Sequence, residues 1–296
     1  MGCWSRDGKN EKRNTKYETR NFFRYPATPL PHHPITPPPR HPATPPPRHP
    51  VTPKTVQRSL EVILNALPSL SLGAITTLQL TIISILLGLA LGTLLAVLRL
   101  SPSRLVRLGA IAYIDFFRGT PLLAQLFMIY FGLPSLLQSM GIGLKFNQWT
   151  AAIVTLSLNG AAYIAEIVRA GIQSIELGQR EASQSLGLGP MQTMRYIVFP
   201  QAFRRMIPPL GNEFISRLKD TSLVAVIGFE ELLRRGQLVV AQTYRAFEIY
   251  FAVALVYLVL TLLSSQFFSF LERWMNPVEK LKRQALQTRS PGDAPG

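Results

Sequence analysis

The stretch Val62–Leu98 decides the fold of this chain. It reads VILNALPSLSLGAITTLQLTIISILLGLALGTLLAVL and lies between the charged residues Glu61 and Arg99. An α-helix crosses the hydrocarbon core of a bilayer with about 20 consecutive, mostly apolar residues. Because this stretch contains no Asp, Glu, Lys or Arg, it is long and apolar enough to span a membrane as a helix.

Three further intervals have the same character. Each holds at least about 18–20 residues that are rich in apolar side chains, which is the length a membrane helix needs. A soluble globular protein does not contain four such intervals, so the sequence predicts an all-α membrane protein. The intervals without charge lie between Arg118 and Lys145, between Lys145 and Glu166, and between Glu248 and Glu272.

We predict five transmembrane helices in total. Gly88, Gly92 and Ala96 are spaced four residues apart in the first one, and such a stripe of small residues lets a second helix approach closely. Pro121 lies inside the second one and predicts a kink or a break there. The five predicted spans are Leu72–Leu98, Leu105–Leu137, Trp149–Ile172, Pro208–Phe229 and Ile249–Leu271.

The fourth predicted span contains four charged side chains, so hydropathy alone would reject it. Glu213 and Arg217 are four residues apart, and Arg217 and Asp220 are three apart, so these side chains can pair on one helix. Lys219 is the fourth charge. Ionisable groups at membrane depth are costly unless they face a bundle interior or a wet cavity, so counting this span relies partly on the family resemblance given below.

A polar segment separates the third and fourth predicted spans. Residues 178–200 read GQREASQSLGLGPMQTMRYIVFP, which is longer than a simple connection between helices requires. The part around Glu181–Leu186 favours a helix, and Gly187–Pro190 ends that helix and opens the next one. Two short helices joined by a tight break form a rigid protrusion that suits the docking of a partner.

The order Glu181-Ala182, Gly187, Ile197 and Pro200 resembles the EAA loop in the permease subunits of ATP-binding cassette (ABC) importers. The chain is similar from about residue 67 to 272 to the permeases for polar amino acids, a family that includes histidine and glutamine permeases. Further residues typical of that family are Phe117–Leu123, Gln125–Phe127, Tyr130–Pro134, Ala162-Tyr163, Glu166-Ile167, Arg169, Pro208–Leu210, Asn212-Glu213, Lys219–Leu223 and Ile227-Gly228. One departure is Ser183, where the family usually has a second Ala.

The resemblance implies translocation of polar amino acids across the inner membrane, driven by ATP that a separate ATPase subunit hydrolyses. It also implies a second permease subunit, identical or homologous, an extracytoplasmic amino-acid-binding protein and membrane lipid as partners. The alternative for the loop is an amphipathic segment that rests on lipid, but its low apolar content argues against that. The residues implied to couple the chain to the ATPase are Gln179, Glu181, Ala182, Ser183, Gly187 and Pro200.

Five residues are candidates for the substrate pathway: Tyr163, Glu166, Arg169, Lys219 and Asp220. The first three lie on successive turns of the third predicted span. Glu166 could receive an amino-acid ammonium group and Arg169 a carboxylate. The alternative is an ion pair within or between helices that fixes their packing, since structural ion pairs also account for buried charges.

Positive charges predict the orientation in the membrane. Loops that contain more Lys and Arg lie on the cytoplasmic side. The sequence therefore predicts that the N-terminus is outside and that the loop at 178–200 and the C-terminus are cytoplasmic. Eleven basic residues lie on the predicted inner side (Arg99, Arg104, Arg107, Arg180, Arg195, Arg204, Arg205, Arg273, Lys280, Lys282 and Arg283), and four lie outside (Lys145, Arg234, Arg235 and Arg245).

The remaining composition excludes several functions. The formal charge is +15, but residues 1–58 hold eleven Lys or Arg against three Asp or Glu, and the rest of the excess flanks the spans, so we expect no nucleic-acid partner. Cys3 is the only cysteine and all four histidines lie before residue 50, so the spans lack common nucleophile and base pairs. No phosphate-binding G-x-x-x-x-G-K-[ST] motif occurs. We expect no enzyme activity, no cofactor and no metal site in this chain.

Residues 1–58 form a separate, Pro-rich part. Thirteen of the 24 prolines lie in 25–54, in an eight-residue repeat typified by HPATPPPR at 41–48. Such a run favours an extended or disordered tail, and it could come from a start site placed too early. Binding to proline-recognition modules, or a metal site made of its histidines, are the alternatives. We predict a transmembrane domain at 59–285 and a flexible tail at 286–296.

Two other classes of function stay open at this point. A secondary transporter or channel driven by an ion gradient usually has internal repeats, and five spans do not divide into two equal repeats. It would also have no use for a docking loop. A membrane enzyme would retain only acid–base groups such as Glu166 or Asp220.

Overall fold

The computed structural model describes residues 53–143 and 145–275, and every regular element in these ranges is a helix. The first helix begins at Pro53, six residues before the predicted start of the transmembrane domain. The Pro-rich repeat, apart from its last residues, and the tail at 286–296 lie outside the described residues, so their predicted character stays a prediction.

Helix α1 (Pro53–Arg99) packs most extensively against α5 (Gln148–Gln173). A Cβ atom at Gly92 would lie 2.7 Å from the backbone oxygen of Ala161, so only glycine allows the helices to approach this closely. Ala96 is fully buried in the same contact. The small-residue stripe predicted from the sequence is therefore confirmed as the α1–α5 interface.

The second predicted span is broken at Pro121, as the sequence predicts. Helix α2 (Arg104–Gly119) ends before it, and Thr120 and Pro121 adopt extended backbone. A helical run then continues to Ser139 and includes one π-helical turn. Its parts are α3 (Leu122–Phe127), η1 (Met128–Gly132) and α4 (Leu133–Ser139).

Two buried amides satisfy the carbonyl groups that this break leaves free. The Gln125 side chain donates to the carbonyl oxygens of Phe117 (2.9 Å) and Thr120 (3.1 Å). Asn159 of α5 donates to the Phe117 oxygen as well (3.1 Å) and to the side-chain oxygen of Gln125 (2.9 Å). Broken helices at membrane depth require such internal partners because lipid supplies none.

The polar segment after α5 forms α6 (Leu177–Ser185), α7 (Pro190–Gln192) and the π-helical turn η2 (Thr193–Val198). Helix α8 (Phe199–Asp220) follows and passes into a 3₁₀ helix, η3 (Thr221–Ile227). The α-helix thus begins earlier and ends earlier than the predicted span Pro208–Phe229. Gly228 ends η3 with φ +81°.

Helices α9 (Leu232–Thr243) and α10 (Ala246–Met275) complete the described part. Glu231 is fully buried and caps α9 by accepting from the backbone amides of Leu233 (2.9 Å) and Arg234 (2.8 Å). Tyr257 of α10 donates to the same carboxylate at 2.7 Å. The Leu232 amide donates to Thr77 of α1 (3.2 Å), so this polar contact joins α1, α9 and α10.

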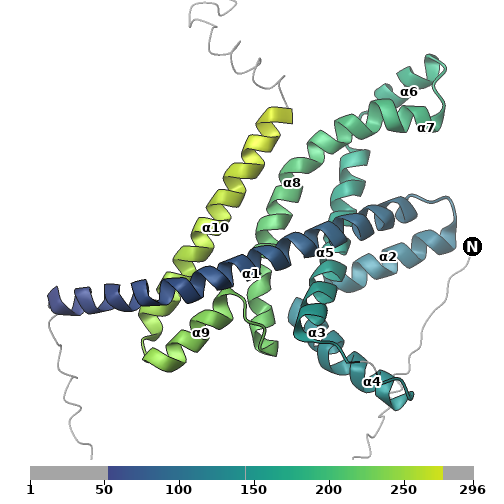
Figure 1. Ribbon diagram of the computed structural model, residues 1–296. Helices are drawn as coiled ribbons and strands as arrows, with labels where there is room; N and C mark the ends of the chain where they lie inside the picture. The colour runs from purple at the N-terminus through teal and green to yellow at the C-terminus, as the bar shows by residue number, and fades with distance from the viewer. Residues whose placement is uncertain (1–52, 144, 276–296) are drawn as a thin grey trace, which may run out of the picture. The chain divides into compact units, whose positions relative to one another are not determined.

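Four helical stretches of the described part are long and apolar enough to cross a membrane: Gln57–Arg99, Leu122–Ser139, Gln148–Gln173 and Ala246–Met275. Helix α8 is not among them, as its charges predict. Figure 1 shows α6 and α7 folded together at one end of α8, with α9 near its other end. Because α5 has 26 residues and rises about 1.5 Å per residue, its two ends lie about 39 Å apart.

Candidate functional site

The predicted coupling segment forms a closed helical hairpin, which consists of α6, α7 and η2 (residues 177–198). Helix α6 ends where Gly187 takes φ +81°, a left-handed conformation that favours glycine. The amide of Leu188 then donates to the Ser183 carbonyl at 3.1 Å, which closes the end of the helix. Pro190 opens the next helix, so the helix–break–helix form predicted from the sequence is confirmed.

Ser183 lies inside this hairpin. It is 2% exposed, and its hydroxyl lies 2.9 Å from the hydroxyl of Thr193 in η2. It also donates to the carbonyl of Arg180 at 2.7 Å. The serine that replaces the usual alanine therefore holds α6 against η2 and is not part of the outer surface.

The other predicted coupling residues are exposed. Gln179, Glu181 and Ala182 lie along the open side of α6, and Pro200 is exposed in the first turn of α8. Large apolar side chains surround them: Leu186 is 83% exposed and Met191 is 79% exposed. An exposed apolar patch with charges at its edge is typical of a protein–protein contact.

One arginine of the hairpin and one arginine of α8 bind the end of α5. The guanidinium of Arg180 donates to the Ile172 carbonyl at 2.8 Å. Arg205 of α8 donates to the carbonyl of Ser174. Charge-assisted hydrogen bonds therefore hold the hairpin and α8 against the end of α5.

Glu166 is the centre of an ionic cluster on α5. It pairs with Arg169 on its own helix at 2.8 Å, with Arg99 at the end of α1, and with Arg118 at the end of α2 at 4.0 Å. One carboxylate thus faces three guanidinium groups from three helices. The packing role weighed for Glu166 and Arg169 accounts for this arrangement.

Tyr163 lies between this cluster and a second one. The guanidinium of Arg118 is 5.4 Å from the centre of the Tyr163 ring, and that of Arg217 is 5.3 Å from it. Cations favour the faces of aromatic rings at such distances. The ring therefore connects the charged groups of α2, α5 and α8.

The second cluster is on α8 and forms as the spacing predicts. Arg217 donates to Glu213 at 2.7 Å, and its guanidinium lies 3.7 Å from Asp220. Glu213 and Arg217 are buried, whereas the Lys219 side chain is exposed. A line of polar groups thus follows the contact between α5 and α8, the two helices that connect the hairpin with the opposite end of the molecule.

The charged groups of the two clusters are paired with one another. Among the described residues, no group of three or more His, Cys, Asp or Glu side chains is placed to hold a metal ion. Sequence reasoning missed Arg99 and Arg118 as partners of Glu166. It also missed the amides Gln125 and Asn159; Gln125, close to Pro121 in an apolar sequence, was an available signal, whereas Asn159 lies in the next span.

Comparison with known proteins places the chain among transport components. The family described as "Binding-protein-dependent transport system inner membrane component" matches residues 88–277. The glutamine transport system permease protein GlnP of Escherichia coli (strain K12) is 43% identical over 210 residues, which cover 71% of this chain and 94% of GlnP. The nopaline transport system permease protein NocM of Agrobacterium fabrum is 37% identical over 222 residues, which cover 74% of this chain and 92% of NocM.

A solved structure has the same fold. A chain from the crystal structure of an amino acid ABC transporter with histidines superposes with a TM-score of 0.66 at 41% identity, covering 71% of this chain and 95% of that one. A chain of the MetNI methionine ABC transporter superposes with a TM-score of 0.53 at 21% identity, which supports the fold alone.

Proposed function

Because the chain belongs to the inner-membrane components of binding-protein-dependent transport systems, we propose that it is the permease subunit of an ATP-driven importer for polar amino acids. The observation that supports this most directly is the hairpin α6–α7–η2. It is exposed, the Ser183–Thr193 contact holds its two parts together, and Arg180 binds it to α5, as a lever driven by a separate ATPase requires.

We propose five spans for this chain. The run α2–α4, whose part Leu122–Ser139 is long and apolar enough to cross, is the second, and α8 with η3 is the fourth, because α8 packs along α5, which is itself long enough to cross. With five spans, the N-terminal end of α1 is extracytoplasmic, and the hairpin and the end of α10 are cytoplasmic, where basic residues are most numerous. The exposed apolar side chains of α1 and α10 face lipid or the second permease subunit.

The relatives support amino acids as the substrate class. Their names give glutamine, nopaline and L-cystine as transported compounds, all of them polar amino-acid derivatives. An extracytoplasmic binding protein would deliver the substrate, and the charged groups around Tyr163, with Lys219 and Asp220, would line its path.

Uptake into membrane vesicles tests the proposal. The chain is produced with the ATPase and binding protein from its own source, and uptake of labelled amino acids is followed with ATP present or absent. We expect uptake that requires ATP and that stops when the ATPase carries a substitution in its phosphate-binding lysine. Uptake driven by a proton or sodium gradient without ATP would identify a secondary transporter instead.

A further inference from the structure

A small polar pocket lies at the end of the molecule opposite the hairpin. Its walls include Gln148, the first residue of α5, and Gly228, the residue that ends η3. The hairpin joins α5 and α8 at their other ends, so the pocket and the hairpin are separated by about the length of α5, about 39 Å. In the proposed topology this places the pocket on the extracytoplasmic side.

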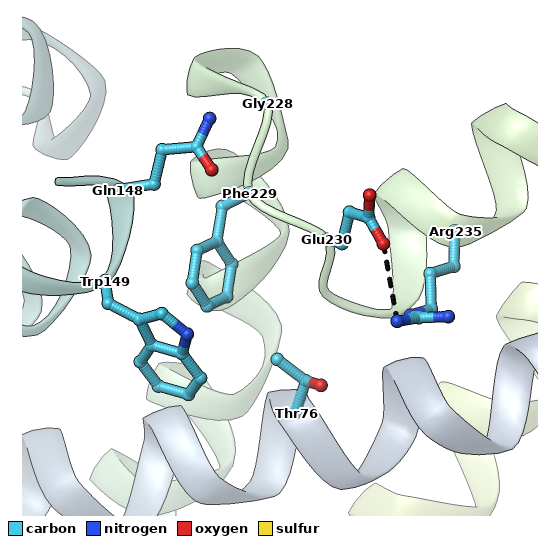
Figure 2. Close-up of a pocket in the computed structure, with 7 residues that line it drawn as sticks. All are labelled: Thr76, Gln148, Trp149, Gly228, Phe229, Glu230 and Arg235. Carbon is cyan, nitrogen blue, oxygen red and sulfur yellow. Dashed lines mark ion pairs between the residues drawn. The ribbon is translucent and has the colours of Figure 1, made fainter.

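The pocket combines one acidic group, one basic group and an aromatic wall (Figure 2). Glu230 and Arg235 lie 3.3 Å apart at the opening. Trp149 and Phe229 form the wall, with ring centres 4.9 Å apart in an edge-to-face arrangement. Thr76 of α1 closes the side opposite Gln148.

The charged pair is open to exchange with a ligand. The Glu230 side chain is 56% exposed and that of Arg235 is 26% exposed, and ion pairs in contact with water contribute little to stability. The Nε atom of Arg235 is buried and has no hydrogen-bond partner among the described residues. A ligand can therefore replace the pair without leaving either group in a worse environment.

Arg235 is held in place by the packing of its aliphatic part. Its Cδ atom would lie 3.0 Å from a Cβ atom built at Gly73 of α1, so the side chain passes directly over that glycine. Its charged end is thereby directed to the pocket, where Figure 2 shows it beside Glu230. A fixed guanidinium is a specific receptor for a carboxylate.

We propose that this pocket binds the α-ammonium and α-carboxylate groups of an amino acid before it enters the pathway between the helices. Glu230 would accept the ammonium group, Arg235 would donate to the carboxylate, and the Trp149 ring would cover the carbon atoms. In an α-amino acid the ammonium and carboxylate groups are attached to the same carbon atom. They therefore lie close enough together to reach both Glu230 and Arg235, whose charged atoms are 3.3 Å apart. The cavity volume of about 280 Å³ suits a ligand as small as a single amino acid.

The inference rests on the proposed function for the class of substrate and the side of the membrane. It adds a binding site in the permease itself that recognises the part common to all α-amino acids. The phosphate and ammonium of an ethanolamine lipid headgroup share this charge pattern. The amino acid is the better candidate, because the aromatic wall lies beside the charged pair and covers a short carbon skeleton.

Protection of a single cysteine tests the site. Because Cys3 is the only cysteine, Cys3→Ser with Thr76→Cys leaves one thiol, at the pocket. Right-side-out vesicles are treated with a cationic, membrane-impermeant methanethiosulfonate reagent, with L-glutamine as the probe. At a concentration about twice its Kd, L-glutamine should slow labelling about threefold by simple occupancy.

The derivatives and variants assign the effect to the two charges. N-acetyl-L-glutamine lacks the ammonium group and L-glutamine methyl ester lacks the carboxylate, and neither should protect. Arg235→Gln should abolish protection by L-glutamine. Arg234→Gln is the matched control, because that side chain binds Gln237 at 3.1 Å and does not line the pocket, and it should keep full protection.

Several results would overturn the site. These are a thiol at position 76 that the reagent does not reach from outside, protection that persists in Arg235→Gln, or protection by glycerophosphoethanolamine and not by L-glutamine. Uptake is measured in parallel. ATP-driven uptake without protection refutes the site and leaves the proposed function intact, whereas protection with uptake that ignores ATP refutes the proposed function and leaves the site.

Discussion

The two ends of the helix pair α5 and α8 differ in how they are held to the rest of the chain. At the hairpin end, large side chains such as Leu177, Leu186 and Tyr196 are more than 60% exposed. At the pocket end, Glu231 and Leu232 are buried, and hydrogen bonds join them to Tyr257 of α10 and Thr77 of α1. Exposed apolar side chains occur at the second end as well, at Tyr244 and Phe247 between α9 and α10, so the two ends differ in the buried polar contact of Glu231 that joins α1, α9 and α10.

This difference separates two functions. The hairpin end presents exposed apolar side chains, and Arg180 holds it to the end of α5. The pocket end is fixed by Glu231. Burial raises the pKa of the Glu231 carboxyl above its ordinary value, and the hydrogen bonds from Leu233, Tyr257 and Arg234 act in the opposite direction. Substitutions at the two ends should consequently have different readouts, coupling at one and stability at the other.

The largest effect is expected from Gly187→Pro. Proline cannot adopt φ +81°, and an incompatible proline costs on the order of 3 kcal/mol, which corresponds to binding weakened on the order of 100-fold. Co-purification with the ATPase should be lost while the thermal stability of the membrane part is unchanged. The control is Gly189→Ala, because Gly189 has φ −69° and space for a Cβ atom. Normal ATPase binding by Gly187→Pro would contradict the role of the hairpin.

The second prediction concerns the pocket end. Glu231→Gln replaces a buried carboxylate that accepts three hydrogen bonds, and it should lower the stability by about 2–3 kcal/mol. Thermal unfolding of the detergent-solubilised protein measures this loss. Glu230→Gln, at the exposed neighbouring position, should change the stability by less than about 0.5 kcal/mol. Equal effects at positions 230 and 231 would mean that the polar contact does not hold this end together.

The third prediction concerns the helix contact between the two ends. Gly92→Ala places a Cβ atom 2.7 Å from the Ala161 backbone, so α1 must move away from α5, at a cost of about 1–3 kcal/mol. Gly109→Ala is the matched control, since no atom lies within 4 Å of a Cβ atom there. The difference in melting temperature between the two variants measures the contact. A Gly92→Ala protein as stable as Gly109→Ala would show that the helices are farther apart.

The smallest effect is expected from Ser183→Ala. The substitution removes the hydroxyl pair with Thr193 and should weaken the hairpin by about 1 kcal/mol. Uptake should stay within about twofold, because Ser183 lies inside the hairpin, while amide hydrogen exchange at α6 should become faster. A loss of uptake as large as that of Gly187→Pro would place Ser183 in the docking surface.

Much of this fold could be predicted because the signals are local. Gly92, Pro121 and Gly187 each act on the few residues around them, so their effects on packing, helix break and turn follow from the sequence. The pairing of Glu213 with Arg217 follows from helical spacing in the same way. The end of α8 at Asp220, where the 3₁₀ helix η3 begins, was missed, whereas Gly228, a residue type that commonly ends a helix, ends η3.

The parts that sequence reasoning missed depend on how helices cross. Arg99 and Arg118 reach Glu166 only because α1, α2 and α5 meet at that point. The pocket brings together Thr76, Gln148 and Arg235, which are more than 70 residues apart in sequence. The periodicity of the sequence does not predict such contacts between distant residues, because they depend on the angles at which the helices pack.

The central claim is that the hairpin and the pocket lie on opposite sides of the membrane, with the ATPase on the hairpin. Single cysteines at Leu186 and at Thr76, each in the Cys3→Ser background, test it with an impermeant thiol reagent. We predict that position 186 is labelled only from the cytoplasmic side and is protected by the ATPase, and that position 76 is labelled only from outside. Labelling of position 186 in intact cells would contradict the account.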